Sequence, residues 1–332
     1  MKLSFRNLFP LLLLLLFRLP GIAQNCATRE EIPDQTKTGL EAAARQTFDQ
    51  ASRGDVEGLR TNAIPSLQSN FNGIAGAVND NKPALAGATP QLRAEFLLDT
   101  GPTPSQDGRF YCGVFGANGL PPNGAEFDIP GLPAGKYSVV IQDVMGSKGP
   151  YSLTTIYQDL NGWKLAGFYV RPGAVLGHDG FWYLQQARDF KTKGQNHNAW
   201  FYYVTSWDLL APVTFMDTRL LSKITQESTG VQPKDVPSNG TPVTYSANGR
   251  QYSITDMSVY KAGNTFDLSV KYSVPSTADF NATQADARSL ANALATQYPE
   301  LKDGFSQIWA HAVDPNGNDV VGIISLKPVA KP

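Results

Sequence analysis

The sequence has few of the residues that usually carry chemistry in proteins. Its 332 residues include only two cysteines, three histidines and four methionines. No pair of histidines or cysteines has the spacing of a metal site, so we expect no bound metal. The chain also lacks a nucleophile elbow, a phosphate-cradling glycine loop and a paired-carboxylate signature. We therefore predict no cofactor, and the sequence alone assigns no catalytic residue.

Charge is also scarce, because charged residues make up only 17 % of the chain and 29 acidic residues face 28 basic ones. Proteins that bind nucleic acid usually present a basic stripe, so we expect no nucleic-acid partner. The 42 % apolar residues, 30 glycines and 23 prolines favour short strands joined by turns over a coiled coil or a disordered chain. The length suggests two or three domains.

The long apolar run of the chain lies at its N-terminus. Lys2 and Arg6 precede the run Leu8–Phe17, and the small residues 21–23 follow it, which is typical of a cleaved secretory signal. About ten apolar residues are too few to cross a bilayer, which needs roughly twenty. We predict a signal peptide over residues 1–23, no transmembrane segment and a periplasmic or secreted protein. Removal of the signal peptide would leave 25 basic and 29 acidic residues and a net charge of −4.

Cys26 and Cys112 both survive the predicted cleavage. In an oxidising compartment the default expectation is one disulfide, which would attach the N-terminal tail to a strand. A lipid anchor on Cys26 is an alternative that Gln24 and Asn25 disfavour, because a lipobox needs small residues before its cysteine. Two unpaired thiols are the second alternative.

The spacing of apolar residues changes along the first half of the chain. Residues 37–80 carry apolar side chains at helical spacing and predict amphipathic helices, the first of which ends at Gly54. From about residue 91 the period becomes two, which predicts antiparallel strands separated by glycine- and proline-rich turns. We therefore expect an N-terminal tail over residues 24–36 and one α+β domain over residues 37–173.

The clearest local prediction is a hairpin from Tyr151 to Val170. Its centre, Asn161-Gly162, is the preferred pair of a two-residue type I′ turn. This register pairs Asp159 with Lys164, Tyr157 with Ala166, and Thr155 with Phe168. Both faces of the hairpin are apolar, so both should be covered. The N-terminal helices can cover one face, and a later element or a second subunit must cover the other.

The rest of the chain divides into a helical part, a linker and a second α+β part. Residues 174–228 are rich in aromatic side chains and predict helices, with a break at Gly194. Residues 229–242 are rich in proline, glycine and serine, and we expect a linker there. Residues 243–328 predict a small ββαββ domain, with a helix between two pairs of strands.

Two resemblances to known folds refine this picture for the α+β domain. The order of helices, curved strands and final hairpin, together with the segment 161–170, resembles the nuclear-transport-factor-2-like superfamily. That resemblance covers residues 37–173 and implies a cone-shaped α+β roll with a cavity. The segment 127–137 instead resembles the Gly-x-Tyr turn of transthyretin-like β-sandwiches. A sandwich therefore stays an alternative for residues 91–170.

Residues 180–213 resemble a single tetratricopeptide repeat. The matching positions are Ala187, Phe190, Gly194, Ala199, Tyr203 and Ser206, while Pro212 falls one residue late. Such repeats normally stack on neighbours, so we expect this lone helical hairpin to pack on the uncovered face of the strand hairpin. The aromatic run from Phe181 to Trp207 is expected to form core rather than to stack sugars or bases.

Two candidates for acid–base chemistry stand out. Asp143 continues the apolar face of residues 137–141, so its strand carries it towards a covered side where burial would raise its pKa. His178 lies in a turn directly before Asp179, and the two residues together are a candidate pair for acid–base chemistry. The alternative is that Asp179 caps the next helix and His178 is an exposed loop residue.

The other two histidines are expected to be structural. His197 stands among polar residues, so we predict a solvated helix start. His311 alternates with apolar residues on a predicted strand and should be partly buried.

These patterns favour a non-catalytic extracytoplasmic envelope protein that binds a small apolar ligand or a partner protein through the roll. The candidate ligand-binding residues are Asp143, Tyr157, Trp163, Tyr169 and His178. One alternative is an isomerase- or hydrolase-like enzyme that uses Asp143 or His178. Another is a structural assembly factor that forms a homodimer through the uncovered sheet face.

Overall fold

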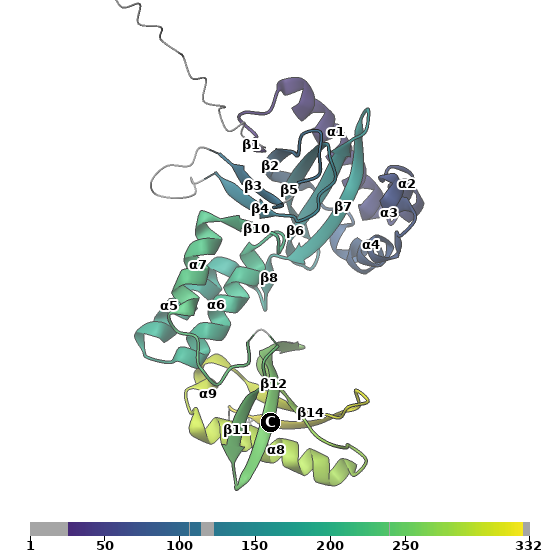
Figure 1. Ribbon diagram of the computed structural model, residues 1–332. Helices are drawn as coiled ribbons and strands as arrows, with labels where there is room; N and C mark the ends of the chain where they lie inside the picture. Colours follow the sequence, from purple (N-terminus) through teal and green to yellow (C-terminus); the bar gives the residue numbers. More distant parts are fainter. Residues whose placement is uncertain (1–25, 106, 114–122, 239, 328–332) are drawn as a thin grey trace, which may run out of the picture.

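The computed structural model describes residues 26–105, 107–113, 123–238 and 240–327, and the predicted signal peptide lies outside these ranges. The chain is an α+β protein with three parts in a row (Figure 1). An N-terminal part of helices and antiparallel strands is followed by three middle helices and then by a C-terminal sheet. In the described ranges, no helix combines the length and the apolar character needed to cross a bilayer.

Four helices form the N-terminal cover of the first part. They are α1 (Asp34–Arg53), α2 (Val56–Thr61), α3 (Pro65–Gln68) and α4 (Asn72–Leu85). The predicted helix end is confirmed, because Gly54 adopts the left-handed conformation, with φ 73°, directly after α1. Leu40, Phe48 and Ala51 of α1 are buried, as their helical spacing indicates.

The first part contains two sheets. The N-terminal sheet has the order β1-β2-β5-β6-β7, with every neighbouring pair antiparallel. Its strands are β1 (Cys26–Thr28), β2 (Pro90–Asp99), β5 (Lys136–Gly146), β6 (Gly149–Asp159) and β7 (Trp163–Pro172). The small sheet has the order β10-β4-β3, formed by β3 (Arg109–Cys112), β4 (Ala125–Asp128) and β10 (Met216–Thr218).

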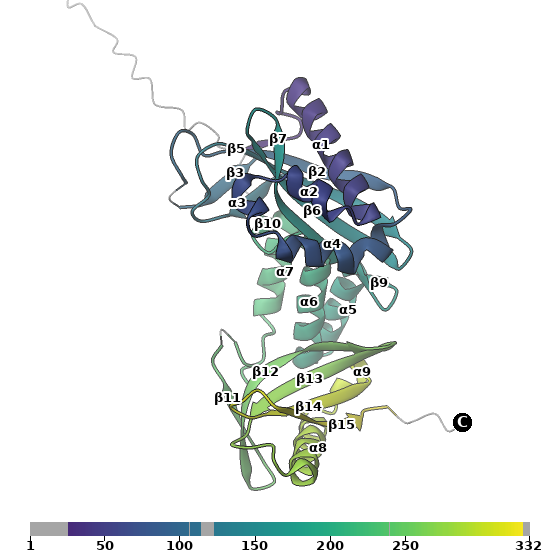
Figure 2. The same ribbon diagram turned by 90° about the vertical axis from the view of Figure 1, so that its right-hand side faces the viewer.

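Each face of the N-terminal sheet has its own hydrophobic core. The helices cover one face (Figure 2). Leu153, Tyr157 and Phe168 of the sheet share a core with residues of α1 and α4 there. The small sheet covers part of the other face, and the predicted disulfide between Cys26 of β1 and Cys112 of β3 is confirmed within this second core. From the sequence, we expect either a later element of the chain or a second subunit to cover this face. The strand β10 is such a later element and belongs to the cover.

The turn of the β6–β7 hairpin differs from the prediction by one residue. Three residues separate the strands, so Asp159 lies opposite Trp163, and Lys164 lies opposite Gln158. The predicted Asp159–Lys164 pair is therefore wrong. Asp159 Oδ1 instead accepts a hydrogen bond from the Gly162 N–H at 3.2 Å, which closes the longer loop.

A β-bulge then restores the predicted register further along the hairpin. Ala166 is the extra residue of the bulge, so Tyr157 pairs with Leu165, while the Thr155–Phe168 pair is confirmed. Because the bulge shifts the alternation, Leu165 packs against the helices rather than on the opposite face.

The middle part consists of α5 (Gly180–Thr192), α6 (Asn196–Leu210) and α7 (Arg219–Thr229), preceded by the short strands β8 (Ala174–Val175) and β9 (His178–Asp179). The break at Gly194 is confirmed, with φ 73° at this residue. Asp179 caps α5, because its Oδ1 accepts a hydrogen bond from the Trp182 N–H at 2.9 Å.

The C-terminal sheet has five strands in sequence order, β11 (Val243–Ala247), β12 (Arg250–Ala262), β13 (Thr265–Ser273), β14 (Gln307–Val313) and β15 (Asp319–Ser325). The helices α8 (Phe280–Gln297) and α9 (Leu301–Gly304) join the parallel pair β13 and β14. The predicted ββαββ order missed β11. Its signal is the turn Asn248-Gly249, where both residues adopt positive φ.

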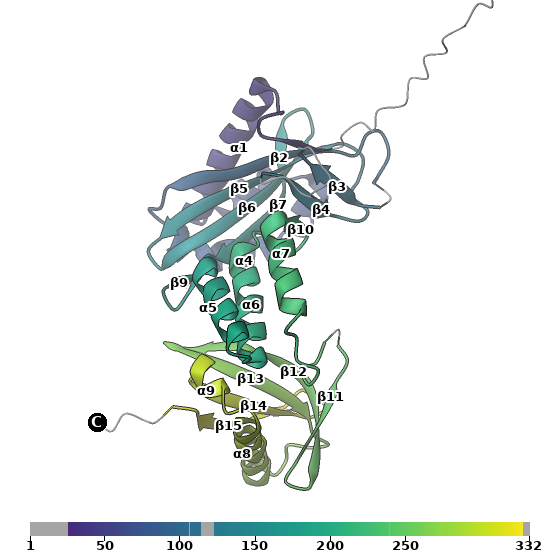
Figure 3. The ribbon, with the colours of Figure 1, turned by 90° about the vertical axis from the view of Figure 1, so that its left-hand side faces the viewer.

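The helices α5 and α6 pack on the C-terminal sheet rather than on the strand hairpin (Figure 3). The ring of Tyr202 lies 5.1 Å from that of Phe266, and its hydroxyl donates a hydrogen bond to the Gly304 carbonyl at 2.8 Å. The expected packing is wrong because the aromatic side chains of α5 and α6 are buried against the C-terminal sheet, and only the ends of these helices reach the N-terminal sheet. The prediction that the aromatic run forms core holds for Tyr183, Tyr202 and Tyr203, which are all buried.

Candidate functional site

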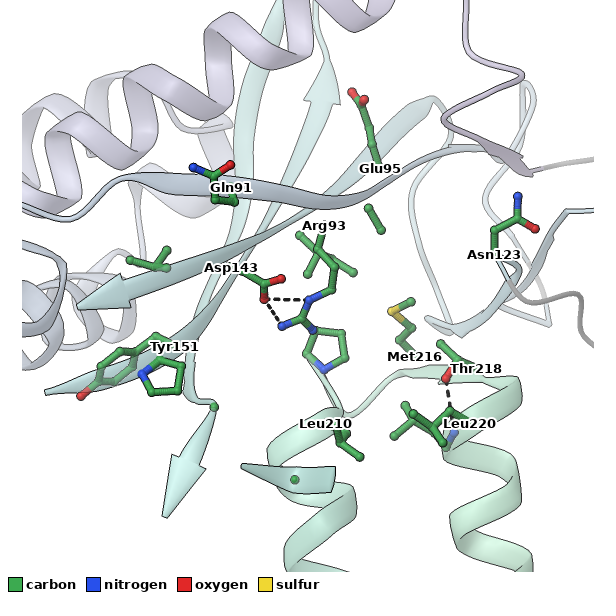
Figure 4. A pocket seen from close by; sticks show the side chains of 18 of the residues that line it. Gln91, Arg93, Glu95, Asn123, Asp143, Tyr151, Leu210, Met216, Thr218 and Leu220 are labelled. Carbon is green, nitrogen blue, oxygen red and sulfur yellow. Dashed lines mark hydrogen bonds and ion pairs between the residues drawn. The ribbon is translucent and has the colours of Figure 1, made fainter. Parts of the chain in front are cut away.

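A cleft of about 990 Å³ lies where the N-terminal sheet meets the ends of the middle helices (Figure 4). Strands β2 and β5 form one side, and β10 with the start of α7 forms the other. The start of α5 and the end of α6 close the cleft towards the C-terminal sheet. This volume lies at the upper end of the range of ligand pockets, roughly 300–1,000 Å³.

A charged pair crosses the sheet side of the cleft. Arg93 Nε donates a hydrogen bond to Asp143 Oδ1 at 2.8 Å, and Arg93 Nη2 contacts the same oxygen. Arg93 is the extra residue of a β-bulge between Leu92 and Ala94 in β2, which brings it alongside Asp143 of β5. The pair fixes one polar point in the cleft.

Asp143 does not have the buried environment that the strand pattern suggested. It does continue the face of Ile141, but its side chain is 52 % exposed. The core beneath the small sheet ends at Ile141, so Asp143 emerges at the rim of the cleft. The expectation that its strand carries Asp143 to a covered side is therefore wrong.

The opposite side of the cleft is mainly apolar. Met216 of β10, Leu210 of α6 and Leu220 of α7 face the charged pair across the cleft (Figure 4). Thr218 caps α7, because its hydroxyl accepts a hydrogen bond from the Leu221 N–H at 3.3 Å. This bond fixes the first turn of α7, which carries Leu220 and Leu221. Apolar walls with one charged pair suit a ligand with an apolar body and a polar end.

Glu95 borders the cleft through its strand, but its side chain points away from the charged pair (Figure 4). Its carboxylate is buried and contacts Arg29, which also binds Glu41 of α1. Burial raises the pKa of Glu95, and the neighbouring Arg29 opposes that rise. This group ties α1 to β2 and belongs to the walls of the cleft rather than to its interior.

The predicted ligand-binding residues do not form one site. Tyr157 is buried in the core beneath the helices, where burial raises the pKa of its hydroxyl to about 12. Trp163 packs beside Gly39 of α1, 3.3 Å from the position that a Cβ there would take. Neither residue lines the cleft, and only Asp143 of the five predicted residues is among the described residues that do.

The two remaining predicted residues lie on the surface. Tyr169 is partly exposed, and its ring contacts that of Phe215 at a centroid distance of 5.5 Å. His178 is exposed and stacks on Trp182 at 3.8 Å. His178 does not line the cleft, although its neighbour Asp179 does.

The expectation of a solvated His197 is wrong. Its ring is buried, with Nε2 3.0 Å from Asp235 Oδ2 and Nδ1 3.5 Å from Glu300 Oε1. Burial alone would raise the pKa of Asp235, but hydrogen bonds from His197 and Tyr298 outweigh it and lower this pKa to about 2. The cluster joins α6 to the predicted linker and to the segment after α8.

His311 is partly buried on β14, as predicted, and its Nδ1 lies 2.8 Å from Asp319 Oδ2. Within the described ranges, no group of three or more His, Cys, Asp or Glu side chains could hold a metal ion.

Sequence reasoning missed the residues that shape the cleft. Arg93 reads as an ordinary outward residue of an alternating strand, since nothing in the sequence marks its bulge. Met216 and Leu220 come from a segment more than one hundred residues away from β2. Only tertiary packing brings such segments together.

Comparison of the chain with protein-family models, with curated proteins and with solved structures finds no match. The resemblances to the nuclear-transport-factor-2-like and tetratricopeptide folds therefore stay predictions from the sequence.

Proposed function

We propose that the protein is a non-catalytic extracytoplasmic binding protein that holds a small, largely apolar ligand between a cone-shaped α+β roll and the middle helices. The observation that carries the proposal is the cleft of about 990 Å³ at this junction. Its walls come from three regions of the chain, so the cleft is a product of the whole fold rather than of one loop.

The lining supports a ligand with an apolar body. Leu210, Met216 and Leu220 lie on one side of the cleft, and each buried methylene of a ligand would contribute about 0.8 kcal/mol. Arg93 and Asp143 bind each other, so the pair is nearly neutral and can orient a polar end without demanding a charged one.

The disulfide supports the extracytoplasmic part of the proposal. Cys26 and Cys112 are both buried and joined, and such bonds form and persist in oxidising compartments. A non-catalytic role is supported by the separation of the two acid–base candidates. Asp143 is bound to Arg93 at the cleft, and His178 stacks on Trp182 outside it.

Isothermal titration with decanol and decanoate, two probes with the same chain length, tests the proposal. We expect both to bind, and Leu220→Trp to weaken both at least tenfold because the larger indole would occupy the apolar space beside Leu210 and Met216. Leu160→Trp, at an exposed position on the β6–β7 loop, is the matched control and should bind like the wild type. Unchanged binding by Leu220→Trp, or no binding of either probe by the wild type, would contradict the proposal.

A further inference from the structure

The outer edge of the C-terminal sheet has an unpaired strand. Within the described ranges, β15 pairs with β14 and with no other strand, and it forms the margin of the sheet beside α8 (Figures 2 and 3). A sheet edge exposes backbone donors and acceptors that can pair with another strand. The edge is seven residues long, from Asp319 to Ser325.

The direction of the backbone groups follows from the bonds on either side of β15. The Asp314 N–H donates to the Asn318 carbonyl at 3.1 Å, and the Leu326 N–H donates to the Ser306 carbonyl at 2.8 Å. Even-numbered residues of β15 therefore bond to β14, and odd-numbered ones point outwards. The bond from Gln284 Nε2 of α8 to the outer carbonyl of Val321, at 3.3 Å, agrees with this direction.

β15 lacks the features that protect the other long edges. The free part of β2 begins with Pro90 and contains the bulge at Arg93. β7 contains a bulge, and its Leu165 is bridged by Ala63. β15 has a regular register along its whole length, no proline and no lysine, and its Ile323 is 38 % exposed. The Gln284 side chain of α8 caps one outward carbonyl, that of Val321, but the regular strand is not otherwise shielded by a bulge or a proline, and such an edge can accept a partner strand.

We propose that two copies of this chain pair through β15, antiparallel and about a two-fold axis at Gly322. Gly322 is the middle residue of the strand, so this register pairs all seven residues. The Ile323 N–H of the second copy then replaces Gln284 Nε2 as the donor to the Val321 carbonyl. It places the two glycines at the close approach on the axis, where Cα atoms lie about 4.5 Å apart. The result is one continuous sheet of both C-terminal sheets.

The strand is complementary to itself in this register. Val321 lies opposite Ile323 of the second copy, so two β-branched side chains meet on the face away from α8. Asp319 lies opposite Ser325 of the second copy, and like charges do not face each other. This charge and shape match favours a second copy over an unrelated strand. The cleft lies at the junction of the N-terminal sheet and the middle helices, away from β15, and stays open in the dimer.

Sedimentation velocity over a concentration series into the millimolar range tests the pairing. The wild type should reach twice the monomer mass, and Ile323→Lys should stay a monomer with an unchanged circular dichroism spectrum. Val204→Lys changes a residue of similar exposure, 37 %, on α6 and should dimerise like the wild type. A wild-type monomer throughout the series, or a dimer of Ile323→Lys, would overturn the proposal.

A charge series at Ser325 tests the register itself. Ser325→Asp places a carboxylate opposite Asp319 of the second copy, and Ser325→Lys places an ammonium there. Each pair occurs twice by symmetry, so we expect the dimer Kd to rise about fivefold in the first variant and to fall about fivefold in the second. Shifts in the same direction in both variants would exclude this register.

Discussion

Loss of the disulfide should destabilise the N-terminal part more than any single exposed substitution. Cys26 of β1 and Cys112 of β3 join the N-terminal sheet to the small sheet and are 86 positions apart in the sequence. In the chain-entropy account, a closed loop of this length stabilises the folded state by about 4.6 kcal/mol at 25 °C. A typical domain is stable by only about 5–15 kcal/mol, so the bond is a large share of the total.

The assay is urea unfolding of the oxidised protein, of the reduced protein and of the double variant Cys26→Ala/Cys112→Ala. Reduction removes the cross-link but keeps both buried sulfur atoms. The free energy of unfolding of the reduced protein should therefore be lower than that of the oxidised protein by about 4.6 kcal/mol. The double variant should lose about 1–2 kcal/mol more, because two buried side chains become smaller.

The outcome that would refute this reasoning is a reduced protein that unfolds within about 1 kcal/mol of the oxidised one. Such a result would mean that the unfolded chain is already compact around β1 and β3, so that the bond restricts it little. Equal losses in the reduced protein and in the double variant would instead show that the two cysteine side chains add no packing of their own.

Two further predictions concern the C-terminal half. Asp235→Asn should cost about 2 kcal/mol at neutral pH, because the pKa of Asp235 is lowered to about 2 beside His197. That stabilisation is present above the ordinary carboxyl pKa of about 4 and is lost as pH falls towards 2, so urea unfolding of wild type and variant should converge there. Gly322→Ala should cost about 2–3 kcal/mol by thermal unfolding, because its Cβ would lie 2.4 Å from the Arg288 backbone nitrogen of α8. Gly76→Ala, with nothing within 4 Å of its Cβ, should not be destabilised.

The cleft depends on how α5 and α6 are positioned between the two sheets. α5 and α6 share a hydrophobic core with the C-terminal sheet through Tyr202, Phe266 and Phe305. Their opposite ends, at Gly180 and Leu210, meet the N-terminal sheet and border the cleft. A ligand in the cleft would therefore contact both the sheet and the helices that connect it to the rest of the molecule.

Local signals predicted the elements of this protein well. Gly54 ends α1 and Gly194 separates α5 from α6, because glycine adopts a left-handed conformation without strain. Asp179 caps α5, and the periods of two and of 3.6 residues separate strands from helices as expected. These features depend on neighbours within a few residues, so the sequence carries them directly.

Predictions that needed contacts between distant segments were less successful. The predicted β6–β7 register is wrong near the turn, because the loop has three residues instead of two. The bulge at Ala166 compensates for the extra loop residue, so only the pairs from Tyr157 to the turn differ from the prediction. His197 reads as a polar helix start, yet Asp235 and Glu300 bury it. No local pattern distinguishes a solvated histidine from one that meets carboxylates from two other segments.

The sequence by itself determined an α+β chain, since hydrophobic periods are local properties, and it limited a disulfide to one pairing, Cys26 with Cys112; that the two thiols do pair is shown by the structure. The tertiary structure alone decided which surfaces meet. It placed the helices on the C-terminal sheet, exposed Asp143 and brought Arg93 beside it, and left the edge of β15 unpaired among the described strands. The physical reason is that each apolar face can be buried only once, and which partner buries it depends on the whole chain.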